Sequence, residues 1–374
     1  MRDPFTAPAY GDRSLADVIP AVARALGVGL DAHPANPTGL ELPPAPSYVV
    51  FLIDGMGAEL LARHADDAPY LSSLGSSTGT AGVPSTTATS LTSLGTGLVP
   101  GAHGLVGFTS RIPGTDRLLN HLRWDADVDP LEWQPHPTAF GRLAQAGVQV
   151  TSVNKRDFDG SGLTVASQRG ARFVGADRVG ERIAAVVAAS EHEPALTYVY
   201  DPDLDWTGHK FGVASSQWVQ QLAMVDAQAE QLREALPSST RLLVVADHGM
   251  VDSPREARLD IDAVDGMRDG VFVLGGEARF RHLYCSARAV PDVVSTWTEV
   301  LGERATVLTR EDAISCGWFG AVEPRVRARL GDVMVACHGD TAIVSTRDFA
   351  YEDTLVGLHG SLTSAEMLIP ILVG

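Results

Sequence analysis

Apolar runs typical of buried strands and amphipathic stretches typical of helices follow one another along most of the chain. Residues 48–53 form an apolar run rich in valine and isoleucine, which predicts a strand that is buried on both faces. Upstream of it, Leu15, Val18, Ile19 and Leu26 recur at helical spacing and predict a helix over residues 14–26. A Ser- and Thr-rich segment, 82–98, keeps leucines at a spacing of three to four, as on one face of a short helix.

A regular alternation of helices and strands follows in the middle of the chain. Helices predicted at 139–146, 180–190 and 216–235 each precede a predicted strand, at 148–153, 195–200 and 241–246. Such an order predicts parallel strands covered by helices. We therefore expect an α/β fold, a three-layer α/β/α sandwich with a mostly parallel central sheet.

The texture of the sequence changes after residue 254. Short strands at 270–274 and 281–285, a helix at 290–301 and a last strand pair at 332–337 and 341–345 are predicted there, before an apolar final strand at 367–373. We interpret residues 255–340 as an inserted α+β subdomain, and residues 1–254 and 341–374 as the core.

Composition narrows the possible partners. The chain has 374 residues, a net charge of −17 and no basic run, which argues against nucleic acid and against an anionic membrane surface. No apolar stretch reaches the length of a membrane span, and the N-terminus lacks the pattern of a secretory leader. Three widely spaced cysteines fit a reducing compartment, so we expect a cytoplasmic protein.

Metal-type side chains gather at the ends of predicted strands. Asp54 ends the first strand, and further candidates follow or precede three others: Asp205 with His209, Asp247 with His248, and His359. Carboxylates and imidazoles in this ratio suit zinc, or alternatively iron or manganese. Taken singly, Asp54 could cap a helix at 58–64, Asp205 and His209 could be a solvated pair, and Asp247 and His248 could form a turn. Taken together, these residues are hard to explain by packing.

At this point the motifs resemble those of a known group. Phe-Leu-Ile-Asp-Gly-Met-Gly at 51–57, Pro-Ser-Thr-Thr at 84–87, Thr-Gly-Leu-Val-Pro at 96–100 with His-Gly at 103–104, Asp-x-x-Gly-His at 205–209, Ala-Asp-His-Gly-Met at 246–250 and His-Gly at 359–360 occur in that order. The set resembles the alkaline phosphatase superfamily and, within it, the nucleotide pyrophosphatase/phosphodiesterases. That resemblance implies the same α/β fold over residues 48–374, apart from the inserted region.

The resemblance also implies two divalent metal ions, expected to be zinc. One ion would be held by four residues: Asp54, Thr87, Asp247 and His248. The other would be held by three: Asp205, His209 and His359. Thr87 would be the nucleophile, at the start of a helix whose N-terminal amides favour phosphate.

The implied activity is hydrolysis of phosphoric esters, at phosphodiester or pyrophosphate bonds, through a phosphorylated or nucleotidylated threonine. Phosphomonoesterase or phosphonate hydrolase activity on the same machinery is the alternative, and a non-catalytic metal-binding protein is the alternative from another class. The partner would be a small phosphate ester.

Several register choices depend on motif spacing alone. For the metal-ligating aspartate, Asp201 and Asp203 are alternatives to Asp205. For the last metal-ligating histidine, His282 and His338 are alternatives to His359. For the nucleophile, Thr86 and Thr89 are alternatives to Thr87.

Two positions depart from the family pattern. Ala88 stands where the diesterases place an aromatic residue that stacks on a nucleobase, and Phe108 stands where they place an asparagine that donates to phosphate. Five residues are candidates for the missing donor: Thr109, Ser110, Asn154, Lys155 and Arg156. Within the insertion, three residues are expected to supply specificity: Trp318, Phe319 and Arg281.

Overall fold

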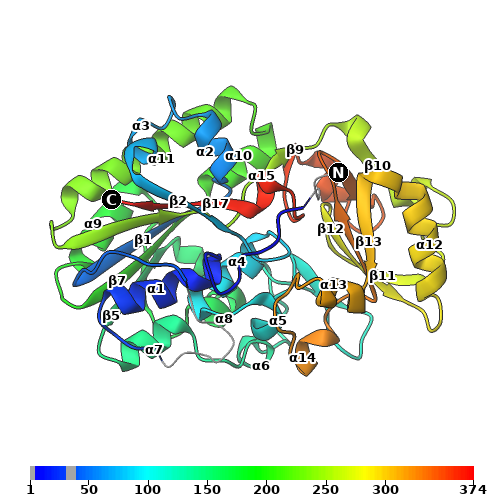
Figure 1. The fold of residues 1–374 in the computed structure, drawn as a ribbon, viewed down its shortest axis with the longest axis horizontal. Coiled ribbons are helices and arrows are strands. Elements are labelled where there is room, and N and C mark those ends of the chain that lie inside the picture. The colour runs from blue at the N-terminus through cyan, green and yellow to red at the C-terminus, as the bar shows by residue number, and fades with distance from the viewer. Residues whose placement is uncertain (1–4, 31–38) are drawn as a thin grey trace.

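A seven-stranded sheet organises the larger lobe of the protein (Figure 1). The computed structural model describes residues 5–30 and 39–374. From one edge to the other, the strands are β2 (Gly75–Thr80), β17 (Leu368–Val373), β8 (Thr240–Val245), β1 (Ser47–Ile53), β7 (Ala195–Asp201), β5 (Gln149–Asn154) and β6 (Arg172–Gly175). From β8 to β6 the neighbours pair in parallel, whereas β17 is antiparallel to both of its neighbours. Strand β1 lies in the middle and is buried along its whole length, as its apolar sequence predicts.

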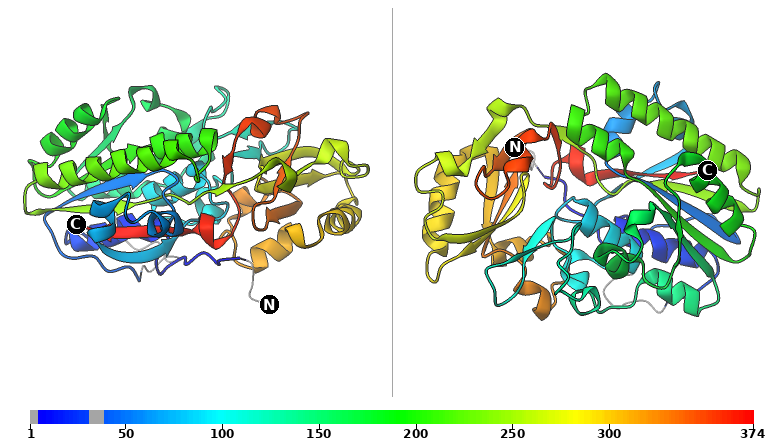
Figure 2. Two further views of the ribbon diagram at one scale, coloured as in Figure 1. Left: turned by 90° about the horizontal axis from the view of Figure 1, so that it is seen from above. Right: turned by 180° about the vertical axis from the view of Figure 1, so that it is seen from behind.

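Helices cover both faces of this sheet, so the predicted three-layer α/β/α sandwich is confirmed (Figures 1 and 2). One layer holds α2 (Ala58–Arg63), α3 (Pro69–Ser73), α9 (Val179–Ala189), α10 (Asp203–Phe211) and α11 (Ser216–Ala235). The other holds α1 (Val18–Ala25), α4 (Thr87–Thr96), α7 (Ala139–Gln145) and α8 (Gly162–Gln168). The predicted helices at 14–26, 139–146, 180–190 and 216–235 thus form, each within a few residues of its expected ends.

A second, smaller lobe lies beside the first and has its own sheet and core (Figure 2). Its sheet has the antiparallel order β11 (Val271–Glu277), β12 (Phe280–Cys285), β14 (Val333–Cys337) and β13 (Ala305–Thr309). Helix α12 (Val290–Leu301) packs on this sheet through the buried Trp297. All of these elements fall inside the range 255–340.

Short elements join these layers. The helical ones are η1 (Leu15–Asp17), α5 (Pro100–His103), α6 (Pro130–Trp133), η2 (Arg156–Phe158), η3 (Arg255–Ala257), η4 (Ile261–Ala263), η5 (Gly302–Arg304), α13 (Arg310–Ser315), α14 (Pro324–Arg327), η6 (Ala350–Thr354) and α15 (Ser364–Met367). The strands are β3 (Thr109–Arg111) paired with β4 (Leu118–Asn120), β9 (Val251–Asp252) paired with β16 (Gly357–Leu358), and β10 (Arg258–Asp260) paired with β15 (Ala342–Val344).

The predicted pairing of strands 332–337 and 341–345 is wrong. Strand β14 already has β12 on one side and β13 on the other, so both of its edges are occupied. The next strand, β15, therefore pairs with β10, in parallel. Because β10 lies in the predicted insertion and β15 in the predicted core, the division at residues 255 and 340 stays a prediction.

The first described residues run across both lobes. The backbone N–H of Thr6 donates to the carbonyl of Leu362 at 2.7 Å, and the hydroxyl of Tyr10 donates to the carbonyl of Trp318 at 2.8 Å. The ring of Phe5 meets those of Trp318 and His338 edge-on. Residues 5–10 thus form a strap between the core and the smaller lobe. Within the described residues, no helix combines the length and the apolar character needed to cross a membrane.

Candidate active site

Two adjacent strands, β1 and β8, end at the same edge of the sheet and bring the first cluster of metal-type residues together. Asp54 follows β1 directly, and Asp247 and His248 come just after β8. The turns that follow touch backbone to backbone, since a Cβ at Gly57 would lie 2.6 Å from the Cα of Gly249. Only glycine allows this approach, which explains why both motifs carry it.

The first cluster consists of Asp54, Asp247 and His248, all buried. The Nε2 atom of His248 lies 3.4 Å from an oxygen of Asp54 and 3.4 Å from an oxygen of Asp247. The other oxygen of Asp247 accepts from the backbone N–H groups of Gly55 and His248, each at 3.0 Å. Backbone donors thus orient Asp247 toward the other two side chains.

Thr87 joins this cluster from the opposite side. It is the first residue of α4, and its hydroxyl lies 3.4 Å from Nε2 of His248. The hydroxyl of Ser90, one turn further on, donates to the carbonyl of Asp247 at 2.9 Å and fixes the helix against the strand end. Thr87 therefore presents its oxygen to the cluster from a helix N-terminus, where backbone amides attract anions.

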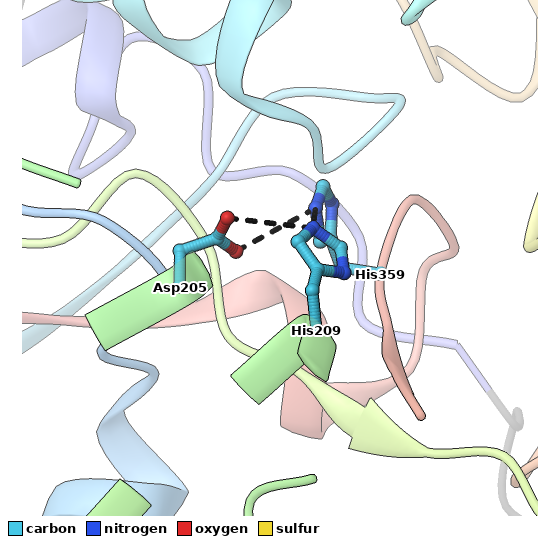
Figure 3. A group of neighbouring side chains, drawn as sticks. All are labelled: Asp205, His209 and His359. Carbon is cyan, nitrogen blue, oxygen red and sulfur yellow. Dashed lines mark hydrogen bonds and ion pairs between the residues drawn. The ribbon is translucent and has the colours of Figure 1, made fainter. Parts of the chain in front are cut away.

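The second cluster consists of Asp205, His209 and His359 (Figure 3). Asp205 and His209 lie one turn apart on α10, as their spacing predicts, and His359 follows β16. Nε2 of His209 is 3.3 Å from Asp205 and 3.2 Å from Nε2 of His359. The second cluster adjoins the first, because the rings of His359 and His248 stack with centroids 3.7 Å apart.

The histidine orientations suit metal binding. Nδ1 of His209 lies 2.8 Å from the carbonyl of Gly357, and Nδ1 of His359 lies 2.9 Å from the carbonyl of Ser85. Those contacts place the proton on Nδ1 and leave both Nε2 atoms as acceptors that face each other. Two nitrogens at about 2.0–2.1 Å from a tetrahedral ion would lie about 3.3–3.4 Å apart, close to the separation of these two atoms.

Carboxylate oxygens without a hydrogen-bond partner among the described residues also suit both clusters to metal binding. One carboxylate oxygen on each of Asp54, Asp205 and Asp247 is buried and has no hydrogen-bond partner within residues 5–30 and 39–374. Burial, together with the neighbouring carboxylates Asp247 and Asp205, raises the pKa of Asp54 well above its usual value. Burial also raises the pKa of Asp247, and it lowers that of His359 well below its usual value. Cations in the clusters would offset the repulsion among these carboxylates, so the residues fit two divalent ions.

Two hollows open beside Thr87 and share Leu122, Asp205 and His209 as well as Thr87 itself. The first, of about 390 Å³, is named here the Phe158 hollow. Its remaining lining is Asp54, Leu91, Asn154, Asp157, Phe158, Ser161, Leu163, Thr164, Gln168, Tyr200, Pro202 and Trp206. The second, of about 250 Å³, is named the Glu277 hollow. Its remaining lining is Thr86, Phe108, Glu277, Ala278, Tyr351, Glu352, Leu355, Leu358 and His359.

The competing aspartates have other partners. Asp201 forms a buried ion pair with Arg182 at 2.8 Å, and Asp203 pairs with Lys155 at 2.7 Å. Asp205 alone of the three faces a histidine cluster. Motif spacing therefore selects the residue that the structure brings to the cluster.

The competing histidines are also placed elsewhere. His282 is buried between the carbonyl of Val106 and the N–H of Gly331, and His338 contacts Thr306 and the carbonyl of Glu303. Their contacts are those of structural side chains.

Among the five candidate donors, Asn154 is the one that lines the Phe158 hollow. Thr109 donates to the carbonyl of Gly276, and Arg156 pairs with Asp177. Ser110 contacts His121, and Lys155 is held by Asp203. The side chain of Asn154 is buried, and its amide nitrogen already donates to Ser152 at 3.0 Å and to Gln168 at 3.1 Å. Its unpartnered atom among the described residues is the carbonyl oxygen, which accepts rather than donates.

Sequence reasoning missed several residues of the site. Tyr200, at the end of β7, donates its hydroxyl to Asp54, and Phe158 and Trp206 give the Phe158 hollow aromatic surfaces that Ala88, itself buried, cannot supply. Glu277 was missed because it follows no motif. Trp318, Phe319 and Arg281 are all buried, and Arg281 is paired with Glu352.

The fold resembles solved hydrolases. Murine ectonucleotide pyrophosphatase/phosphodiesterase 5 superposes with a TM-score of 0.70 at 16% identity, covering 87% of each chain. Phosphonoacetate hydrolase from Sinorhizobium meliloti 1021, solved with phosphonoformate, superposes with a TM-score of 0.67 at 17% identity, covering 90% of this chain and 91% of that one. These likenesses show that the protein has an alkaline phosphatase-like fold.

The family follows from the sequence. The family model described as type I phosphodiesterase / nucleotide pyrophosphatase matches residues 48–362, which is most of the chain. The protein belongs to this family. Family and fold together support a phosphoester hydrolase.

Proposed function

We propose that the protein hydrolyses phosphodiester or pyrophosphate bonds, with Thr87 as nucleophile and two divalent ions, zinc by preference, as cofactors. The observation that carries this proposal is the position of Thr87 beside two adjoining clusters whose carboxylates keep oxygens that no group in the described part of the chain bonds. Asp54, Thr87, Asp247 and His248 would hold one ion, and a second ligand set (Asp205, His209 and His359) would hold the other. When bound, the ions would supply Lewis-acid stabilisation of the charge on the phosphate and favour ionisation of nearby hydroxyl groups.

Thr87 then acts in two balanced steps. Its oxygen forms a bond to phosphorus while the bond to the leaving alcohol breaks; the threonine proton leaves to solvent and the alcohol oxygen takes up a proton. In the second step, the oxygen of one water molecule forms a bond to phosphorus and gives up one proton to solvent, the bond between phosphorus and the threonine oxygen breaks, and Thr87 regains a proton. The sum is one ester bond hydrolysed by one water.

The surroundings of Thr87 support this role. The N-terminal amides of α4 lie where a phosphate would meet Thr87, and Ser90 keeps the helix against Asp247. The two hollows on either side of Thr87 would hold the two substituents of a diester. An inactive threonine-to-alanine variant of the murine relative has been solved in complex with AMP. That finding on a distant relative is compatible with an essential threonine here.

The experiment begins with metal content. Protein purified and reconstituted with zinc should contain about two ions per chain, and chelation should abolish hydrolysis that zinc then restores. The substrates are bis- and mono-p-nitrophenyl phosphate, dinucleotides and phosphonoacetate. Diesters should be hydrolysed fastest; a preference for the monoester or for phosphonoacetate would select the alternative activities. Metal binding without hydrolysis of any substrate would indicate the non-catalytic alternative.

The second part of the experiment tests the nucleophile. Thr87→Ala should lower kcat by several orders of magnitude while zinc content stays nearly intact, because three ligands of that ion remain. Thr87→Ser should retain more activity, because it keeps a hydroxyl. Thr86→Ala and Thr89→Ala serve as controls, and an inactive Thr86→Ala or Thr89→Ala beside an active Thr87→Ala would show that the register is wrong.

The cellular location is proposed on a simpler basis. The thiols of Cys285, Cys316 and Cys337 are free, which supports a reducing, cytoplasmic compartment.

A further inference from the structure

Glu277 is a buried carboxyl group that the proposed mechanism does not use. It lies at the end of β11, where the hairpin to β12 reaches the larger lobe, and it is 8% exposed. Its carboxyl group contacts the hydroxyl of Thr86 and the backbone N–H of Phe108, but its Oε1 atom has no partner among the described residues. An unsatisfied buried oxygen beside a hollow is expected to have a ligand partner.

The position of Glu277 is fixed from several sides. A Cβ at Gly360 would lie 2.8 Å from Cγ of Glu277, so the side chain packs directly on the backbone next to His359. The hairpin itself is tied to the core by a buried ion pair between Arg279 and Glu366, with a nitrogen–oxygen distance of 2.6 Å. Glu277 is therefore held in place rather than free to turn toward solvent.

The rest of the Glu277 hollow has the same character. Glu352 also has a buried oxygen for which the described chain offers no partner, although its other oxygen accepts from Arg281. Phe108 and Tyr351 add two rings whose centroids are 6.2 Å apart. Among the described residues that line this hollow, there is no lysine or arginine. Such a lining accepts hydrogen bonds and favours cations over anions.

The hollow lies on the side of the leaving alcohol. In two-metal sites one ion holds the attacking oxygen and the other holds the leaving oxygen. Thr87 belongs to the cluster of Asp54, Asp247 and His248, so the leaving oxygen belongs with the other cluster. All three members of that other cluster line the Glu277 hollow, although Asp205 and His209 line the Phe158 hollow as well. The distinguishing residues are His359, which lines only the Glu277 hollow of the two, and Asp54, which lines only the Phe158 hollow.

We propose that the Glu277 hollow is the leaving-alcohol subsite, and that Glu277 selects an alcohol carrying a hydrogen-bond donor, an ammonium or a hydroxyl group, against an anionic leaving group. This inference rests on the proposed function and names the substrate class of that site. Burial raises the pKa of Glu277 to about 8, and a cation in the hollow would offset this penalty on the ionised form. A pyrophosphate or carboxylate leaving group would instead meet two carboxyl groups and no cationic side chain among the described lining residues.

The experiment measures binding without turnover, on the zinc-loaded Thr87→Ala variant. Isothermal titration calorimetry compares four methyl phosphodiesters that differ in one substituent: 2-aminoethyl, 2,3-dihydroxypropyl, propyl and 2-carboxyethyl. The aminoethyl ester should bind about tenfold or more tightly than the propyl ester, and the dihydroxypropyl ester about three- to tenfold more tightly. The carboxyethyl ester should bind most weakly. A preference confined to the aminoethyl or to the dihydroxypropyl ester would support the proposal and identify which donor is used.

Variants of Glu277 separate its role from general folding. Glu277→Gln, added to Thr87→Ala, should remove the preference for the aminoethyl ester and keep that for the dihydroxypropyl ester, because the amide oxygen still accepts. Glu277→Leu should remove both preferences. Glu299→Gln, an exposed change on α12 in the same lobe, is the matched control and should alter neither.

Two results would overturn the inference: equal affinities for the four esters, or an unchanged order of affinities in both Glu277 variants, with thermal melts showing that the variants are folded. Failure of the proposed function would look different, since wild-type protein would then hydrolyse none of the esters whatever their affinities.

Discussion

Breaking the buried ion pair between Arg279 and Glu366 should destabilise the whole protein. Both side chains are fully buried, and they meet through two hydrogen bonds, at 3.0 and 2.6 Å. Glu366 also accepts from the backbone N–H of Ser361 at 3.0 Å, two residues beyond His359, and its own carbonyl accepts from the N–H of Gly249 at 2.8 Å. The pair thus connects the β11–β12 hairpin to the loops that carry His248 and His359.

Glu366→Gln leaves the guanidinium of Arg279 buried without a counter-charge. Removing one partner of a buried pair costs about 3–5 kcal/mol. With an unfolding entropy of about 2.1 cal/mol/K per residue, a protein of 374 residues has about 0.8 kcal/mol/K in all, so the Tm should fall by about 4–6 °C. Differential scanning calorimetry of the zinc-loaded protein measures this shift.

The control is an exposed pair of the same lobe. Arg255 and Asp353 lie 3.6 Å apart at the surface, so Arg255→Gln should leave the Tm unchanged within error. A double change, Arg279→Met with Glu366→Leu, should be less destabilising than Glu366→Gln, because no charge stays buried. If Glu366→Gln had the same Tm as Arg255→Gln, the ion pair between Arg279 and Glu366 would not hold the hairpin to the core.

Three further outcomes are expected. His359→Ala should lose zinc and activity, whereas His338→Ala should keep both; the reverse would show that the wrong C-terminal histidine was chosen. Wild-type kcat/KM for ATP and GTP should differ little, because stacking on Phe158 or Trp206 in the Phe158 hollow tolerates any base, and a thousandfold preference for one nucleobase would contradict this. Folding raises the pKa of Glu277 from 4.5 to about 8, so its contribution to stability is fully present below about pH 4.5 and is lost as the pH rises through 8. The wild-type unfolding free energy in urea should therefore fall between pH 6 and 8 by about 2 kcal/mol more than that of Glu277→Gln, and equal slopes would refute the assignment.

The sequence predicted the core of the fold because its strands are buried. Strand β1 has an apolar residue at every position from 48 to 53, because a strand that is buried on both faces needs apolar side chains on both. By contrast, β2 reads Gly-Ser-Ser-Thr-Gly-Thr and lies at the sheet edge with its first four residues largely exposed to solvent, so it carries no apolar signal. Its pairing with β17 depends on the rest of the sheet.

The residues of the candidate site also divide into those that the sequence could predict and those that it could not. Asp54, Asp247 and His248 could be predicted because each follows directly on a buried parallel strand, and such strands end at a common edge. Glu277 could not, because it reaches the site from an antiparallel hairpin of another sheet. No sequence spacing links that hairpin to Thr87; the contact exists only after the two lobes have packed together.

The strap of residues 5–10 constrains the order of events during synthesis. Tyr10 leaves the ribosome long before Trp318, its hydrogen-bond partner 308 positions later in the chain. The hydrogen bond of Thr6 likewise cannot form until Leu362 has been synthesised. The central sheet is also completed late, because β17 lies between β2 and β8 and pairs with both. The two lobes can therefore close on each other only after Trp318 and Leu362 have been synthesised, and until then the early strands have exposed edges that would benefit from a chaperone.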